Sequence, residues 1–253
     1  MTPAPRKPAS ASSGPSRRFA RFEDLPIAVA VDVALVTAEA GQLHALLVRP
    51  TAPEAGGDWA LPGGFVDPSE SVDAAAERVL AAKAGIEDVF LEQLYTFGAV
   101  ERDPRTRVVS VAYYALVERA RLGAVLQADR RLAPLSVPWE GEAGGRVEAL
   151  DEKGRALPLA FDHADILGLV VKRLRGKLRY APIGFELLPD RFPLRALQEI
   201  HETVLGRPLN KHSFRRSVLA SGLVASANRR EKTVGHRPAE LYRFQASKPR
   251  KDR

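Results

Sequence analysis

The chain has 253 residues, of which 45% are hydrophobic and 27% are charged. This balance is typical of a globular protein with one large or two ordinary domains, and no apolar run approaches the roughly 20 residues that a membrane-spanning helix needs. The absence of cysteine excludes disulfides, cysteine-ligated zinc and thiol catalysis, and it fits a reducing cytoplasm.

The net charge of +7 is unevenly distributed along the chain. Residues 1–21 carry five basic and no acidic side chains, residues 22–164 carry 13 basic and 23 acidic ones, and residues 165–253 carry 20 basic and eight acidic ones. We infer an acidic body that binds a small ligand and a basic C-terminal third that binds a polyanion.

Both ends of the chain are predicted to be disordered basic tails, at residues 1–21 and 247–253. The first is rich in Pro, Ala, Ser and Arg, and it buries too little apolar surface to offset the entropy lost on ordering. Arginine and serine without acids would also suit an organelle transit peptide. The four prolines between Pro3 and Pro15 argue against the amphipathic helix that such a peptide needs.

Residues 22–160 are predicted to form a first domain of the α/β (α+β) class. Apolar residues alternate with small or polar ones in the strands, and they recur at helical spacing before Gly85, which ends the helix. The expected elements are strands at 27–37, 43–49, 89–97 and 108–117 and a helix at 71–84. This order indicates a mixed sheet flanked by helices.

The middle of the chain is less regular. Residues 118–158 show no sustained period, although 146–150 can add one short strand. Residues 164–178 then place Ile166, Val170 and Leu174 among others at helical spacing, which predicts a helix. We interpret it as a connection between two domains, within residues 161–180.

Residues 181–246 are predicted to form a winged helix-turn-helix domain. Helices at 194–205 and 211–221 are separated by a short connector, with Asn210 as the N-cap of the second. Segments 223–226 and 240–244 can pair as a ribbon with a basic tip.

The second of these helices is the predicted reader of DNA. Phe214 and Val218 face inward with Leu219 beside them, and this leaves the basic residues on the exposed sides. The alternative is a basic face that only contacts solvent, but the wing-tip arginines and the regional charge favour DNA contact. The expected DNA-binding residues are Lys211, His212, Ser213, Arg215, Arg216, Arg229, Arg230, Lys232, His236 and Arg237.

The stretch from Gly63 to Ile86 resembles a Nudix box without its metal ligands. Gly64, Glu70, Arg78, Gly85 and Ile86 fit the pattern, and Trp59-Ala-Leu-Pro-Gly-Gly-Phe65 is the expected lead-in. The three positions that should carry metal-binding glutamates are Val79, Ala82 and Lys83. Two apolar groups offer no ligand atoms and an ammonium repels Mg²⁺, so we expect no metal, no cofactor and no catalysis.

The whole chain is similar to the NrtR group, the Nudix-related transcriptional regulators of NAD metabolism. The resemblance covers about residues 25–245. It rests on segments 94–98, 102–105, 108–114, 175–180, 185–188, 205–209 and 237–244. It implies a homodimeric cytoplasmic repressor that binds ADP-ribose or a related nucleotide or sugar metabolite and holds a palindromic operator.

The effector site is predicted from guanidinium groups that suit diphosphate oxygens and an aromatic ring that suits adenine. The residues expected there are Gly63, Gly64, Arg78, Phe97, Arg102, Arg105 and Arg107. The three arginines from Arg102 to Arg107 also fit a solvated hairpin tip, and Arg78 can pair with Glu70 or Glu77 instead. Two other functions stay open: an active Nudix pyrophosphohydrolase with an appended nucleic-acid-binding domain, and a non-specific nucleic-acid binder.

Overall fold

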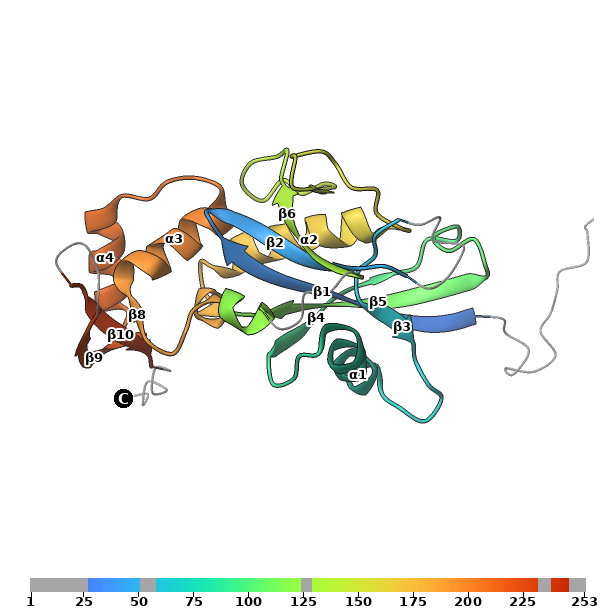
Figure 1. Ribbon diagram of the computed structural model, residues 1–253, viewed down its shortest axis with the longest axis horizontal. Helices are drawn as coiled ribbons and strands as arrows, with labels where there is room; N and C mark the ends of the chain where they lie inside the picture. Colours follow the sequence, from blue (N-terminus) through green and yellow to red (C-terminus); the bar gives the residue numbers. More distant parts are fainter. Residues whose placement is uncertain (1–26, 51–57, 124–128, 232–237, 246–253) are drawn as a thin grey trace, which may run out of the picture.

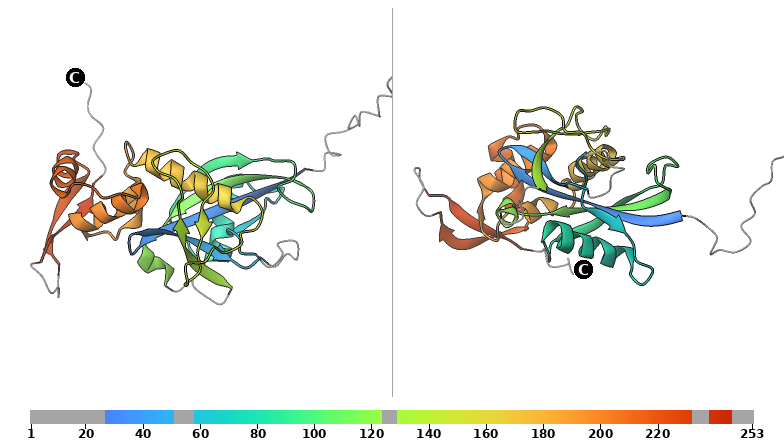
Figure 2. Two further views of the ribbon diagram at one scale, coloured as in Figure 1. Left: turned by 90° about the horizontal axis from the view of Figure 1, so that it is seen from above. Right: turned by 45° about the vertical axis from the view of Figure 1, so that its right-hand side comes forward.

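The computed structural model describes residues 27–50, 58–123, 129–231 and 238–245. Figure 1 shows a large twisted sheet at one end of an elongated molecule and a smaller helical unit with its own sheet at the other. Figure 2 shows the same two units from further directions, joined along α2 and α3. None of the described helices has the length and hydropathy needed to cross a bilayer.

The larger sheet has seven strands within the described residues, in the order β4-β5-β1-β2-β6-β7 with β3 beside β1. They are β1 (Ile27–Glu39), β2 (Gln42–Val48), β3 (Gly63–Phe65), β4 (Phe90–Phe97), β5 (Arg107–Leu116), β6 (Arg130–Ser136) and β7 (Glu148–Ala149). The central pair β1 and β5 is parallel, and the other pairings are antiparallel. The predicted mixed sheet flanked by helices is thereby confirmed.

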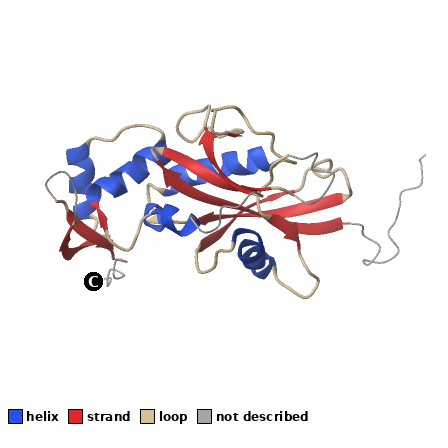
Figure 3. Cartoon of the chain, in the orientation of Figure 1, coloured by secondary structure: helices blue, strands red, loops and turns tan. Residues whose placement is uncertain are grey.

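Helices cover both faces of this sheet (Figure 3). Val31, Val33 and Leu35 of β1 pack against α1 (Val72–Ala84), whereas Ala34 and Val36 pack on the side of α2 (His163–Lys177). Because both faces are covered, all apolar residues of β1 from Ala30 to Val36 are buried. A polar side chain on this strand therefore needs a partner inside the protein.

Helix α1 begins and ends where its local sequence predicts. The Ser71 hydroxyl accepts a hydrogen bond from the N–H of Ala74 at 3.1 Å, as an N-cap does. Gly85 adopts a left-handed conformation with φ of 63° and donates its N–H to Ala81 O. Its buried residues include Ala75, Ala76, Val79 and Leu80, the face that the sequence predicts.

The smaller unit is a winged helix-turn-helix. It consists of β8 (Phe192–Pro193), α3 (Leu194–Leu205), α4 (Lys211–Ala220), β9 (Val224–Arg230) and β10 (Glu240–Phe244). Two 3₁₀ helices precede these elements in the chain, η3 (Arg119–Leu122) and η4 (Ile183–Leu187). The Asn210 side chain accepts from the N–H of Ser213 at 3.0 Å, so the predicted N-cap is confirmed. Phe214 and Val218 pack on the core of the unit as predicted, but Leu219 does not: it is exposed, because it lies one residue beyond the inward-facing pair.

Helix α3 contributes to two hydrophobic cores. Leu194 and Leu197 pack with Phe192 and Tyr242 in the winged helix, whereas Ile200 and Val204 belong to the core between the large sheet and α2. The helix that the sequence predicts at 164–178 is present as α2, and it also lies in that larger core. The two units therefore share continuous packing.

Two leucines of the winged helix differ in burial and test this assignment. Leu197 is 0% exposed and Leu219 is 44% exposed. We expect Leu197→Ala to lower the free energy of unfolding by about 2–5 kcal/mol through loss of apolar burial and formation of a cavity. Leu219→Ala should change it by about 0.5 kcal/mol or less. Urea denaturation followed by circular dichroism measures both, and equal effects would contradict the assigned core.

Candidate functional site

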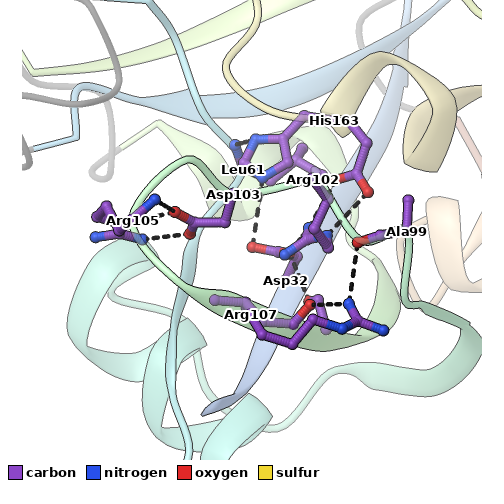
Figure 4. A network of polar contacts seen from close by, with 11 residues as sticks. Asp32, Leu61, Ala99, Arg102, Asp103, Arg105, Arg107 and His163 are labelled. Atoms are coloured by element: carbon purple, nitrogen blue, oxygen red, sulfur yellow. Dashed lines mark hydrogen bonds and ion pairs between the residues drawn. The ribbon is translucent and has the colours of Figure 1, made fainter. Parts of the chain in front are cut away.

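A small cavity lies on the α2 side of the large sheet, near the start of α2. Its volume is about 70 Å³. It is lined by Ala30, Asp32, Gly64, Phe65, Arg102, Asp103, Val108, Phe161 and His163. Figure 4 shows the polar network around it. Charged and aromatic side chains from β1, β3, the β4–β5 connection and the residues before α2 converge here.

The centre of the network is Asp32, a buried carboxylate on β1. Ser110 Oγ donates to it at 2.6 Å, and Arg102 Nη2 donates at 3.1 Å. Burial by itself would raise the pKa of Asp32, but His163, Ser110 and Arg102 more than offset this and lower the pKa to about 2. Asp32 therefore stays ionised in the folded protein.

His163, the first residue of α2, completes this network. Its Nδ1 accepts a hydrogen bond from the N–H of Leu61 at 3.0 Å, which assigns the ring proton to Nε2. Nε2 lies 3.4 Å from Oδ1 of Asp32. The imidazole thus connects the lead-in to the Nudix-like box with the central strand.

Arg102 is a buried cation between two carboxylates. Besides Asp32, it bonds Asp162 through Nε at 2.9 Å and through Nη2 at 2.6 Å. Asp162 immediately precedes α2. The interpretation of Arg102 as part of a solvated hairpin tip is therefore wrong, because Arg102 is only 9% exposed.

Arg105 lies at the rim of the cavity, between two aromatic rings. Its guanidinium carbon is 5.4 Å from the ring centroid of Phe65 and 5.7 Å from that of Phe161. Its Nε and Nη2 donate hydrogen bonds to the carboxylate of Asp103, at 2.9 Å and 2.7 Å. Phe65 is 48% exposed, so an aromatic face and a guanidinium are presented together to solvent.

The remaining predicted effector residues occupy different places. Gly64 lines the cavity, and Gly63 lies behind it, where a Cβ would stand 2.3 Å from Oδ1 of Asp32. Arg107 donates to the carbonyls of Gly98 at 2.8 Å and Ala99 at 3.0 Å, which closes the β4–β5 connection. Phe97 packs edge-to-face on Tyr95. Of the predicted residues, Gly64 and Arg102 line the cavity and Gly63 and Arg105 contact its lining residues, whereas Arg78, Phe97 and Arg107 are not among those that line it.

The box helix presents no acidic cluster to the sheet. Val79 is buried in the core, and Arg78 pairs with Glu70 through Nε at 2.9 Å and donates from Nη2 to Phe65 O at 3.0 Å. Lys83 Nζ donates to Gly63 O. No group of three or more His, Asp or Glu side chains in the described residues could hold a metal ion.

Several residues of the cavity lie outside the set predicted from the sequence, among them Asp32, Phe65, Asp103, Phe161 and His163. Asp32 is the one charged residue inside the apolar run from Ile27 to Thr37, a signal that could have identified it. His163 and Phe161 gave no such signal, because only the fold brings them to β1.

Larger cavities, of about 910 and 1260 Å³, lie where the sheet meets α3. Their charged residues include Arg175, which donates to Trp139 O and Gly141 O, and Arg179, which pairs with Glu142 at 3.5 Å. We place the candidate ligand site at the smaller cavity, because charged and aromatic side chains converge there.

The basic helix α4 lies on the surface of the winged helix. The predicted residues Lys211, His212, Ser213, Arg215 and Arg216 are all exposed. Arg229 and Arg230 are exposed on β9, facing Leu241 and Glu240 of β10. The other predicted contacts, Lys232, His236 and Arg237, lie outside the described residues.

Comparisons with known proteins agree with this architecture. Residues 26–149 match the NUDIX domain family and residues 184–244 match the NrtR DNA-binding winged helix domain. A relative from Acinetobacter baylyi, described as "ADPR responsive transcriptional repressor NtrR", is 37% identical over 216 residues, which cover 85% of this chain and 80% of the relative.

Solved structures match over similar lengths. Shewanella oneidensis NrtR in complex with a 27mer DNA is 32% identical, with a TM-score of 0.72 over 86% of this chain and 93% of that chain. A MutT/nudix family protein from Enterococcus faecalis shares the fold, with a TM-score of 0.68 at 24% identity over 88% of this chain and 90% of that chain.

A Nudix domain followed by a DNA-binding winged helix defines a class of transcription regulators that carry an enzyme fold as a sensor. Within this class, the chain belongs to the NrtR family.

The ionised state of Asp32 predicts an acid-dependent contribution to stability. Its folded pKa, about 2, lies below the ordinary value of 3.8, so the contribution is complete above pH 4 and is lost as the pH falls towards 2. A shift of this size corresponds to about 2 kcal/mol. The free energy of unfolding of the wild type should therefore approach that of Asp32→Asn over this range, because the variant lacks this carboxylate and keeps the other acids of the chain. Urea denaturation at each pH measures the gap, and a constant gap would contradict the assignment.

Proposed function

We propose that this protein is a ligand-controlled transcriptional repressor that binds ADP-ribose, or a related nucleotide or sugar metabolite, without hydrolysing it. Its sensing domain spans residues 22–160, a connecting helix 161–180 and the DNA-binding domain 181–246. It acts as a cytoplasmic homodimer on a palindromic operator of genes of NAD metabolism. For two-fold symmetric binding the half-sites lie about one helical turn apart, roughly 34 Å.

The observation that carries this proposal is the physical connection between the cavity and the DNA-binding unit. Helix α2 starts at Asp162 and His163, beside the cavity, and its 15 residues extend roughly 22 Å. Near its other end Arg175 donates from Nε to Val204 O of α3 at 2.9 Å. If the hydrogen bonds between Arg102 and Asp162 changed, α2 would shift. That shift would be passed on to α3, the first helix of the winged unit.

The chemistry of the cavity supports a nucleotide ligand. A volume of about 70 Å³ is too small to enclose a nucleotide, whose sites usually measure 300–1,000 Å³. The ligand would lie across the mouth, with its base on the exposed ring of Phe65 and a phosphate on Arg105. A phosphate that reaches Arg102 would compete with Asp162 for the guanidinium.

The box supports sensing without hydrolysis. Val79 is in the core, Ala82 has no ligand atom, and Glu70, an acid of the same box, is paired with Arg78. Mg²⁺ needs oxygen ligands in octahedral geometry, and these side chains supply no set of them. The relative from Acinetobacter baylyi is likewise described as a repressor.

Arg105 tests the ligand site. We expect Arg105→Ala to weaken ADP-ribose binding about 10- to 100-fold, because a charge-assisted hydrogen bond to phosphate contributes about 1.5–3 kcal/mol. Arg155→Ala is a matched control: Arg155 pairs with Asp151 as Arg105 pairs with Asp103, through its N–H and its guanidinium, in a turn away from the cavity. Titration calorimetry measures both, and equal affinities would contradict the assigned site. Failure of the wild type to bind any nucleotide or sugar phosphate would refute the proposed function.

Arg215 and Arg216 test the DNA interface. Each of Arg215→Ala and Arg216→Ala should weaken operator binding roughly 5- to 150-fold, because an arginine contact to a base contributes about 1–3 kcal/mol. Binding of ADP-ribose should stay unchanged in both variants.

Gel shifts with operator and scrambled DNA measure these effects, with Arg155→Ala as the control for loss of one surface charge. Unchanged gel shifts for both variants would count against the assigned helix. Equal affinity for operator and scrambled DNA would identify a non-specific binder instead.

A further inference from the structure

Two cations of α1 line the edge of β3 next to the cavity. Lys83 Nζ donates to Gly63 O, and Arg78 Nη2 donates to Phe65 O at 3.0 Å. The two carbonyls belong to alternate residues of β3, so they point in the same direction. The ammonium and the guanidinium therefore lie side by side between α1 and β3.

Lys83 occupies a position where the Nudix pattern has a metal-binding glutamate. The two companion positions, Val79 and Ala82, carry no ligand atoms, so the helix face that would hold a divalent ion now presents one ammonium. We propose that the Lys83 ammonium takes the place of the metal ion and, together with Arg78, binds the diphosphate of the effector directly. This inference rests on the proposed function and adds a residue and a metal-independent mode of binding to it.

The donors of Lys83 are suited to this role. An ammonium has three N–H donors, and Gly63 O is the only acceptor among the described residues that bonds to it. Two donors remain for phosphate oxygens. The bond to Gly63 O holds the long side chain in one orientation, so less rotamer entropy is lost when an anion binds.

The position of Gly63 connects this cation pair with the cavity. Its carbonyl bonds to Lys83, and its Cα packs against Asp32, where a Cβ would lie 2.3 Å from Oδ1. Lys83 and the floor of the cavity are thus separated by one residue of β3. Gly64 and Phe65, the next two residues, line the cavity itself. A nucleotide with its base on Phe65 can reach the cation pair with its diphosphate across this short strand.

A metal ion would be unfavourable at the same place. Asp32, the nearest buried carboxylate, is fully engaged with Ser110, Arg102 and His163. Glu70 is held by Arg78. A divalent cation at this place would be repelled by the positive charges of Lys83 and Arg78, while Asp32 and Glu70 are already paired with other groups.

The test is calorimetric titration of the full-length protein with ADP-ribose, in EDTA and in Mg²⁺. The wild type should bind with the same affinity in both buffers. Lys83→Gln keeps a donor for Gly63 O but removes the charge, and it should weaken binding about 10-fold or more in both buffers, because charge-assisted hydrogen bonds to phosphate are lost. Lys83→Arg should retain most of the affinity. Lys153→Gln, at an exposed turn, is the matched control and should bind like the wild type.

Lys83→Glu should make binding depend on Mg²⁺, unlike binding by the wild type. Its carboxylate should weaken binding in EDTA, and Mg²⁺ should restore part of the affinity, because Mg²⁺ can bridge one carboxylate and substrate phosphates. Wild-type binding that requires Mg²⁺, or Lys83→Gln binding like the wild type, would overturn the inference and leave the proposed function intact. Absence of binding by the wild type in both buffers would refute both.

Discussion

The interaction on which the structure depends most is the clamp of Arg102 between Asp32 and Asp162. The guanidinium of Arg102 is buried and bonds to Asp32 on the central strand and to Asp162 at the start of α2. Because Arg102 belongs to the β4–β5 connection, these bonds also fix that connection against β1 and α2. Removing one member would leave a buried charge without its partner, which is among the costliest changes a protein interior can undergo. The clamp therefore fixes the walls of the cavity and the position of α2 together.

The frame of the Nudix-like box is held by contacts that involve none of the three metal positions of the pattern. Ser71 and Gly85 still define the ends of the helix, and Arg78 still holds Glu70 and the carbonyl of Phe65. These contacts shape the loop and need no metal. Residues 26–149 match the NUDIX domain family, although Val79, Ala82 and Lys83 stand at the three positions where the pattern has metal-binding glutamates.

The sequence predicts those parts of the fold whose signals are local. Helices α1, α3 and α4 are found nearly to the residue, because caps such as Asn210 and stops such as Gly206 act within one turn. Strand β6 is missed, because it contains Pro134 and gains its regularity from pairing with β2. Strand β3 is three residues long and has no period to detect.

The candidate site is predicted only in part for the same reason. Arg102 and Arg105 stand out as basic residues in a loop, but their partners come from distant segments: Asp162 lies 60 residues from Arg102, and Ser110 lies 78 residues from Asp32. Asp32 lies on the face of β1 whose neighbours Ala34 and Val36 belong to the core with α2. The helix α4 that we propose as the DNA reader needed no such long-range information, since its apolar pair and its exposed basic residues are neighbours in sequence.

The membership of α3 in two cores limits how this protein can be divided. A fragment that begins at residue 184 would bring the aliphatic side chains of Ile200 and Val204, normally covered by the sheet and α2, into contact with water. Such a fragment would tend to self-associate through them. A chimaera that joins the sensing domain of one family member to the winged helix of another at this boundary would thus also need the residues of the sheet and α2 that pack against Ile200 and Val204.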